Sequence, residues 1–242
     1  VGYDSMTTNT NGATNTAIGA NSLKANTEGN NNVAAGFGSL DVNTTGSDNI
    51  AIGYDAGGAS TTGHSNVAIG RDALLTEDTG RKNVAIGYQA LRVQNSDADN
   101  INTAVGYQAG VAITTGTNNV AIGANALDAN TTGGENCAFG TGALGSNTTA
   151  SYNTALGRHA AGAITTGHSN TAIGRYSLLT STTGSYNTGL GRDALRYTTT
   201  ADNNTGIGFA ALSANTTGGD NTAVGKAALT ANTTGERNTA VG

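Results

Sequence analysis

Three arginines spaced 17 residues apart, Arg158, Arg175 and Arg192, have the side chains best suited to binding a ligand. If the spacing stacks them one strand apart, their charges repel each other unless an anion lies beside them. Asp193, next to Arg192, relieves this repulsion only in part. One interpretation of this spacing is a groove for a polyanion, such as an acidic or phosphorylated polysaccharide. The alternatives are a solvated edge with splayed side chains, or pairing with acidic residues of a neighbouring chain.

Aromatic residues fill the equivalent place elsewhere in the chain, at Tyr88 and Tyr107 and also at Tyr54, Phe37 and Phe209. An exposed aromatic ring offers an apolar face with a polar or solvated rim, which suits stacking on a sugar ring. Tyr88 and Tyr107 are therefore candidate carbohydrate contacts. The alternative is that these rings only cover the edge of the fold.

The segment Asn95-Ser-Asp97-Ala-Asp99-Asn100 alternates oxygen-bearing side chains like the start of a calcium loop. Asn100 stands where such a loop needs Gly, and Gly106 stands where it needs the closing Glu, so we predict no metal site. The segment is better explained as a two-residue bulge. Because such loops often carry recognition, Asn95, Asp97 and Asp99 remain candidate ligand contacts.

No set of residues has the types and spacing of a catalytic site. His64 and His168 share the phrase Gly-His-Ser-Asn but lie six repeats apart, too far to bind one metal ion within a chain. No serine or threonine recurs with a histidine and a carboxylate as nucleophilic catalysis requires. We therefore expect neither enzymatic activity nor a cofactor.

Charge and hydropathy exclude two classes of partner. The net charge is −5, with 16 acidic and 11 basic residues, which argues against nucleic-acid binding. No apolar stretch approaches the length needed to cross a bilayer. We therefore expect neither a nucleic-acid partner nor membrane insertion in this segment.

A 17-residue repeat organises these residues. The Gly that ends Asn15-Thr-Ala-Ile-Gly19 recurs at steps of 17, with one step of 19 between Gly87 and Gly106. A fixed period of this length predicts a solenoid, and disorder would not keep residue types in phase. We expect residues 1–242 to form one repeat domain of about fourteen coils. Since Val1 is not a natural start and both ends fall in phase, we expect a fragment of a longer fibre chain.

Positions within a coil are counted here from the Asn that opens this phrase. Two apolar runs, at positions 2–4 and 8–9, are too short for helices and predict two short strands per coil. The fold class is therefore all-β, a parallel β-roll. In two of the three coils that lack the usual Leu of position 9, those with Gly110 and Ala161, position 12 becomes Ile113 and Ile164. The third, with Gly57, has Ser60 there and shows no such change. Close packing makes the change to Ile a volume compensation, which places position 9 inside the coil.

Two further columns have structural explanations. The invariant Asn of position 1 predicts a ladder of side-chain amides or a turn cap. Strand alternation places positions 2 and 4 on one face and position 3, always Ala or Gly, on the other. Both faces are apolar, so one is left for solvent, and a uniformly small column also suits the close approach of another backbone. We therefore expect side-by-side association of identical chains, most economically three.

The phrase seen at Asn66-Val-Ala-Ile-Gly70, Asn83-Val-Ala-Ile-Gly87 and Asn119-Val-Ala-Ile-Gly123 resembles the head repeats of YadA-like trimeric autotransporter adhesins. The longer phrase, as in Asn221-Thr-Ala-Val-Gly225 with Asn232-Thr-Thr-Gly235, also resembles repeat regions of bacteriophage tail fibres. The resemblance covers the whole chain. It implies a left-handed β-roll in a trimeric extracellular fibre, on a cell surface or a virion, that binds host molecules or glycans. It supplies no catalytic residues.

Two other functions fit the same repeat. One is a purely structural filament or spacer without a ligand. The other is an ice-binding solenoid, because Thr recurs at position 2 from Thr154 to Thr239 and flat threonine arrays order water. Against ice binding, position 2 is Val or Ile at Val33, Ile50 and Val67, which breaks the array.

Overall fold

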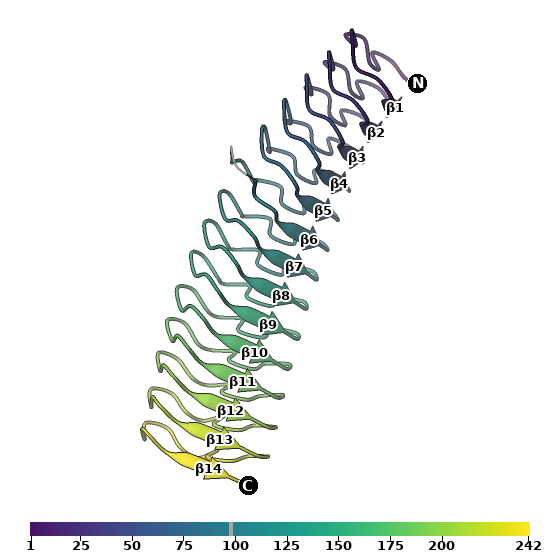
Figure 1. The fold of residues 1–242 in the computed structure, drawn as a ribbon. Helices are drawn as coiled ribbons and strands as arrows, with labels where there is room; N and C mark the ends of the chain where they lie inside the picture. Colours follow the sequence, from purple (N-terminus) through teal and green to yellow (C-terminus); the bar gives the residue numbers. More distant parts are fainter. Residues whose placement is uncertain (97–98) are drawn as a thin grey trace. The chain divides into compact units, whose positions relative to one another are not determined.

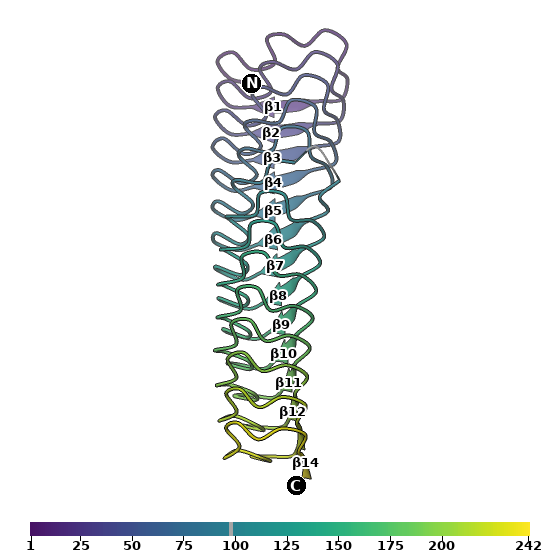
Figure 2. The ribbon, with the colours of Figure 1, turned by 90° about the vertical axis from the view of Figure 1, so that its left-hand side faces the viewer.

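The structure, a computed structural model, describes residues 1–96 and 99–242. It contains two compact units, Val1–Asn119 and Val120–Gly242, each of which is a stack of similar coils (Figures 1 and 2). Every strand has three residues and occupies positions 2–4 of its coil. The strands of the first unit are β1 (Thr16–Ile18), β2 (Val33–Ala35), β3 (Ile50–Ile52), β4 (Val67–Ile69), β5 (Val84–Ile86) and β6 (Thr103–Val105). Those of the second are β7 (Val120–Ile122), β8 (Cys137–Phe139), β9 (Thr154–Leu156), β10 (Thr171–Ile173), β11 (Thr188–Leu190), β12 (Thr205–Ile207), β13 (Thr222–Val224) and β14 (Thr239–Val241).

Within each unit, every strand pairs in parallel with the next strand along the chain. The register matches equal positions, so Ala17 lies opposite Ala34, and Ala172 lies opposite Gly189. The 19-residue coil keeps this register, since Ala85 lies opposite Ala104. The predicted all-β, parallel β-solenoid with coils of about 17 residues is confirmed. No helix in the described ranges is long and apolar enough to cross a membrane.

The prediction of a second strand at positions 8–9 is wrong. These residues form turns, and the backbone at positions 7 and 9 is left-handed, as at Tyr176 (φ 61°) and Leu178 (φ 51°). Alternate left-handed residues curl the chain, so it cannot form a pleated strand. The curled segment still bonds to the next coil, for example from Leu178 N to Ala194 O at 3.0 Å. These bonds and the burial of Leu offset the cost of the left-handed conformation, about 1–2 kcal/mol per residue.

The interior of each coil pairs a small side chain with a large one. Position 3 is buried Ala in most coils, and the Leu of position 9, as at Leu91 and Leu144, is fully buried. The predicted inward orientation of position 9 is therefore confirmed. Ile113 and Ile164 are also fully buried, as the volume argument requires. The small column was open to a second explanation, contact with another backbone; it faces inward, so the narrow interior accounts for its size.

Two ladders of asparagine side chains run through the coils. The position 1 ladder was predicted: Asn32 Oδ1 accepts from Asn49 N at 3.0 Å, and Asn32 Nδ2 donates to Gly46 O at 2.8 Å. A second ladder at position 12 was not predicted, and there Asn43 Nδ2 donates to Asn26 Oδ1 at 2.9 Å. Both ladders satisfy backbone groups that the turns would otherwise leave buried and unpaired.

Candidate binding surfaces

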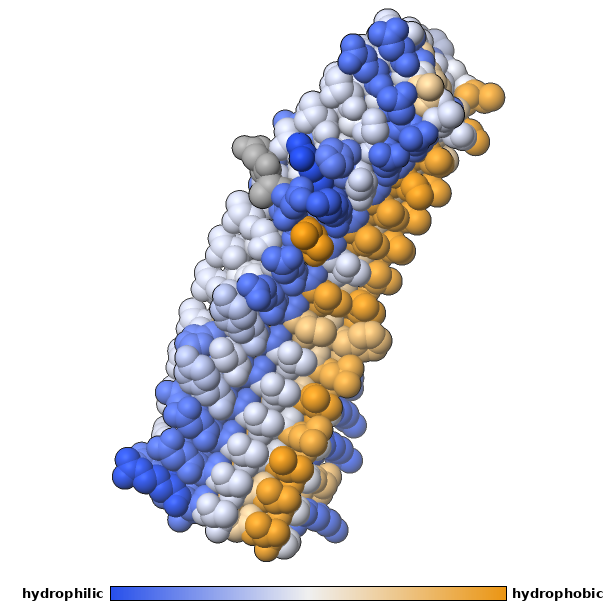
Figure 3. Space-filling view, viewed as in Figure 1, coloured by the Kyte–Doolittle hydropathy of each residue, from blue (hydrophilic) through white to orange (hydrophobic). Residues whose placement is uncertain are grey.

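The outer face of the strands is an exposed apolar surface in each unit. Because position 3 points inward, positions 2 and 4 point outward. The exposed fraction is 55% for Ile18, 50% for Phe139 and 45% for Leu156. Figure 3 shows hydrophobic side chains following the strands through each unit, beside a hydrophilic surface. We name positions 2 and 4 the apolar face. It can bury a comparably apolar surface, and water is a poor partner for it.

Cys137 lies on this apolar face. It occupies position 2 of β8, and its side chain is exposed and forms no disulfide. Other coils have Val, Ile or Thr at this position, so Cys137 stands in a column of small strand residues. Its outward direction makes the thiol a natural reporter for any surface that covers the face.

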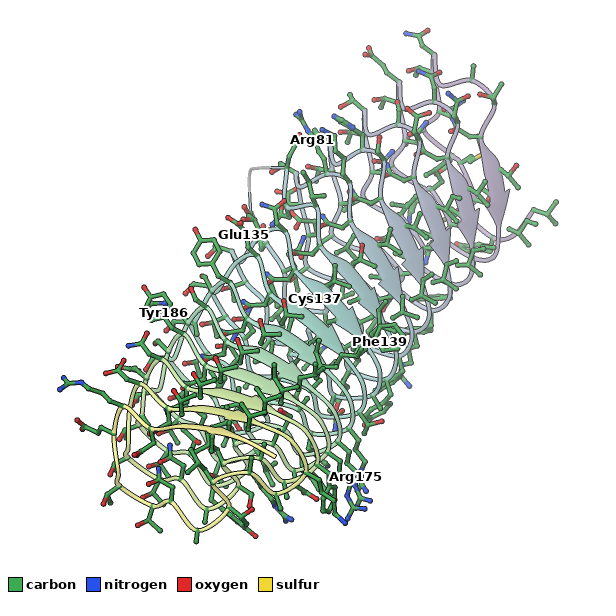
Figure 4. All side chains as sticks on the ribbon, turned by 60° about the horizontal axis from the view of Figure 1, so that its bottom comes forward. Arg81, Glu135, Cys137, Phe139, Arg175 and Tyr186 are labelled. Atoms are coloured by element: carbon green, nitrogen blue, oxygen red, sulfur yellow. The ribbon has the colours of Figure 1, made fainter. Side chains whose placement is uncertain are left out.

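A second surface lies on the turn after the strands in the second unit. Position 6 places Arg158, Arg175 and Arg192 there, and all three side chains are exposed. In Figure 4 the Arg175 side chain points away from the coils, on the same side as Phe139 and opposite Glu135 and Tyr186. The position is set by the preceding Gly, as at Gly174, whose φ of +128° turns the chain out of the strand. The structure thus brings the three predicted arginines onto one edge.

Tyr176 and Arg196 join this edge, although the sequence did not point to them. The guanidinium carbon of Arg175 lies 4.4 Å from the Tyr176 ring centre, and that of Arg196 lies 5.2 Å from it. Arg175 Nη2 also donates to the Tyr176 hydroxyl at 3.2 Å. This hydrogen bond, with the charges of Arg158, Arg175 and Arg196, lowers the pKa of Tyr176. The local field is therefore positive and favours an anion.

One carboxylate serves two members of the cluster. Asp193 Oδ2 lies 3.0 Å from Arg192 Nε, and Asp193 Oδ1 lies 3.1 Å from Arg196 Nη1. In the described residues no ion pair involves Arg158 or Arg175. We name Arg158, Arg175, Arg192 and Arg196, with Tyr176 and Asp193, the basic edge. It holds four guanidinium groups against one carboxylate.

Charge in the second unit is segregated between two edges. Its six basic and six acidic residues cancel in number. Five of the bases lie at positions 6 and 10: Arg158, Arg175, Arg192, Arg196 and Lys226. Four of the acids lie at positions 16 and 17: Glu135, Asp202, Asp220 and Glu236. Net charge therefore conceals a basic edge on this unit.

The aromatic candidates of the first unit stack on one another. The ring centres of Tyr88 and Tyr107 lie 5.4 Å apart with planes 11° apart, and those of Phe37 and Tyr54 lie 5.3 Å apart. Tyr88 and Tyr107 are both exposed, as predicted. Mutual stacking takes up part of each ring face, which fits a cover for the edge at least as well as a sugar site.

The calcium-like segment contains a carboxylate that already has a partner. The Asp99 side chain pairs with Lys82 at 2.5 Å, and this hydrogen bond lowers the pKa of Asp99. Asn95 is exposed, and Asp97 lies outside the described residues. In the ranges 1–96 and 99–242 there is no group of three or more His, Cys, Asp or Glu residues placed to hold a metal ion. Asn95 and Asp99 are therefore close in sequence, but the described residues around them do not form a metal-binding site.

Sequence reasoning missed Tyr176 and Arg196 because they occupy positions 7 and 10. These positions meet position 6 only when the turn curls, which the second-strand prediction did not allow. The available signal was the contrast within the second unit between bases at positions 6 and 10 and acids at positions 16 and 17. Comparisons with protein-family models, with curated proteins and with solved structures found no match to this chain.

Proposed function

We propose that this chain is a structural and adhesive segment of an extracellular trimeric fibre, on a bacterial surface or a phage particle, which presents a surface to host molecules or glycans. The observation that carries the proposal is the apolar face. Its exposed Ile, Leu and Phe side chains repeat coil after coil, as at Ile52, Phe139 and Leu190. A soluble chain leaves such a stripe uncovered only at the cost of aggregation. A second copy of the same repeat offers a matching stripe in the same register.

The number of chains and the winding rest on the resemblance of the repeat phrase. It implies three chains around an axis, with left-handed coils. Three identical chains around one axis form a closed ring of contacts, so every apolar face is covered and no further chain can add at the sides. The absence of catalytic residue sets in the sequence fits a structural and adhesive role.

Lysine at Leu156 and Leu190 is expected to convert the trimer to monomers. Both side chains are exposed in the single chain, at 45% and 42%, so the coil tolerates the change. Between chains, each lysine would bury a charge without a partner. Sedimentation equilibrium should give three times the chain mass of 23.8 kDa for the unchanged protein and that mass alone for the double variant. Cys137 should react slowly with a maleimide in the first and quickly in the second.

The matched control is Thr166→Lys with Thr200→Lys. Both threonines are exposed at position 14 of the same two coils, away from the apolar face. This variant adds the same charge and should remain trimeric. A monomeric unchanged protein, or a trimer that survives lysine at Leu156 and Leu190, would contradict the proposed assembly.

One observation favours ice binding as a second candidate. The threonines of position 2 in the second unit, from Thr154 to Thr239, all lie on the outward face of parallel strands in register. Regularly spaced hydroxyl and methyl groups on a flat face can order water. Monomeric protein should then show thermal hysteresis at millimolar concentration, and Thr188→Lys should reduce it strongly. If thermal hysteresis is absent from both the monomeric variant and the unchanged protein, this function is excluded.

A further inference from the structure

We infer that the basic edge of the second unit binds a linear polysaccharide that carries sulfate, phosphate or carboxylate groups, with Arg158 and Arg175 as its main contacts. This inference rests on the proposed adhesive function and names the ligand class of that surface. It concerns the turn side of the coils, whereas trimer formation concerns the apolar face. The two can therefore be tested separately.

Unpaired charge is the first argument. Asp193 pairs with Arg192 and Arg196 and acts on Arg175 only through its charge. The exposed guanidinium groups of Arg158 and Arg175 therefore have no salt bridge among the described residues. Arg175 is held in place by Tyr176, through the 3.2 Å hydrogen bond and the ring contact. A positioned guanidinium presents a planar fork of donors that matches the oxygens of sulfate, phosphate or carboxylate.

The opposite edge of a neighbouring chain does not supply the missing anions. Positions 16–17 precede each strand and position 6 follows it, so they border the apolar face on its two sides. In the proposed trimer, with its chains in register, the basic edge of one chain would lie beside the position 16–17 edge of the next. The three coils from Asn136 to Tyr186 carry no acid on that edge; they have Ser151, Tyr152, His168, Ser169, Ser185 and Tyr186 there. Glu135 and Asp202 flank these rows but do not fall within them. Arg158 and Arg175 therefore need an anion from outside the assembly.

Repetition of the charges points to a polymer. Arg158, Arg175 and Arg192 occupy equal positions in three consecutive coils, β9 to β11, whose strands pair in register. Parallel strands stack about 4.8 Å apart, so the guanidinium groups form a row along the stack. A single phosphate would use one or two of them. A chain with an anionic group on successive sugars can use them all.

The ring contacts favour a glycan over a nucleic acid. Single-stranded nucleic acids bind on aromatic rings with free faces. Tyr176 has Arg175 at 4.4 Å from its ring centre, and the His159 ring stacks on it at 6.0 Å. Its faces are therefore taken, and Tyr176 acts as a positioning residue.

The test measures binding of a heparin octasaccharide by calorimetry at low salt, with the trimeric protein. Serine at both Arg158 and Arg175 should weaken binding by about tenfold or more, because two charge-assisted contacts are lost. The matched control replaces Lys24 and Arg237 by serine. Each of these bases lies near an acid, at 3.3 Å and 3.9 Å, and outside the basic edge. The control removes the same charge and should bind as the unchanged protein does.

Further arms identify the ligand and separate the two proposals. An oligogalacturonate replaces sulfate by carboxylate, and arginine-dependent binding of either glycan supports the inference. Absence of binding to both, or equal weakening in the control variant, overturns it. Tighter binding of a single-stranded DNA of equal length also overturns it, in favour of nucleic acid. If the Arg158 and Arg175 variant loses its trimer, these arginines are contacts between chains and the inference fails. A trimer that binds neither glycan leaves the fibre assembly intact as a spacer.

Discussion

Alanine at Gly174 is expected to destabilise the second unit by about 3 kcal/mol or more. Gly174 has φ +128°, a region that residues with a side chain rarely adopt. A Cβ there would lie 2.5 Å from Gly191 O and 2.6 Å from Gly191 C. The obstructing atoms belong to the backbone of the next coil, so no rotamer change relieves the clash. Strain and overpacking therefore add at one site.

Thermal unfolding followed by circular dichroism measures this effect, and Gly219→Ala is its control. At Gly219 the nearest atom to an added Cβ is Asp202 O at 3.3 Å, and φ lies outside the left-handed range. The control should change the melting temperature little, since its one contact needs only a small adjustment. If the Gly174 and Gly219 variants have the same melting temperature, the close stacking of position 5 glycines does not limit stability.

The position 5 glycine also shows what the sequence could establish about the fold. Its recurrence at steps of 17 is explained by the backbone, which has positive φ at Gly19, Gly174 and their equivalents. The repeat alone did not show that each glycine lies against the backbone of the next. That contact depends on the path between coils, which is not a local property of the sequence.

The second apolar run was misassigned for a related reason. Ala-Leu at positions 8–9 and Ala-Ile at positions 3–4 look alike as short apolar pairs. Their conformations differ because Leu178 is buried in a curled segment that bonds to Ala194, whereas Ile173 lies on a strand that pairs with Leu190. Leu has no intrinsic preference for a left-handed backbone, so only the packing of adjacent coils decides the outcome.

The candidate surfaces also have some features that the sequence predicts and others that only the structure shows. Equal spacing was enough to predict that Arg158, Arg175 and Arg192 share an edge, because a solenoid preserves column identity. The participation of Tyr176 and Arg196 depended on the curled turn, which sequence periodicity does not show. The direction of the apolar face also required the structure, since alternation alone leaves either side of the strand inward.

Alanine at Asn170 should cost the second unit about 2–5 kcal/mol, because it removes both halves of a buried bridge. Asn170 Oδ1 accepts from Asn187 N at 3.0 Å, and Asn170 Nδ2 donates to Gly184 O at 2.9 Å. Alanine leaves this amide and this carbonyl without those partners, and Asn187 and Gly184 are buried. Each buried polar group that loses its partner carries a desolvation penalty that a lost contact at the surface does not.

Comparison with Asn11→Ala separates the ladder from the residue type. Asn11 is exposed, so its replacement should shift stability by less than about 0.5 kcal/mol. The melting temperature and the denaturant midpoint of both variants give the difference. Hydrogen exchange should also speed up at the Asn187 amide, whose acceptor is lost, more than at amides of distant coils. If the two variants are equally stable, water replaces the Asn170 side chain at no cost in free energy. The ladder would then set the register of the coils without contributing to their stability.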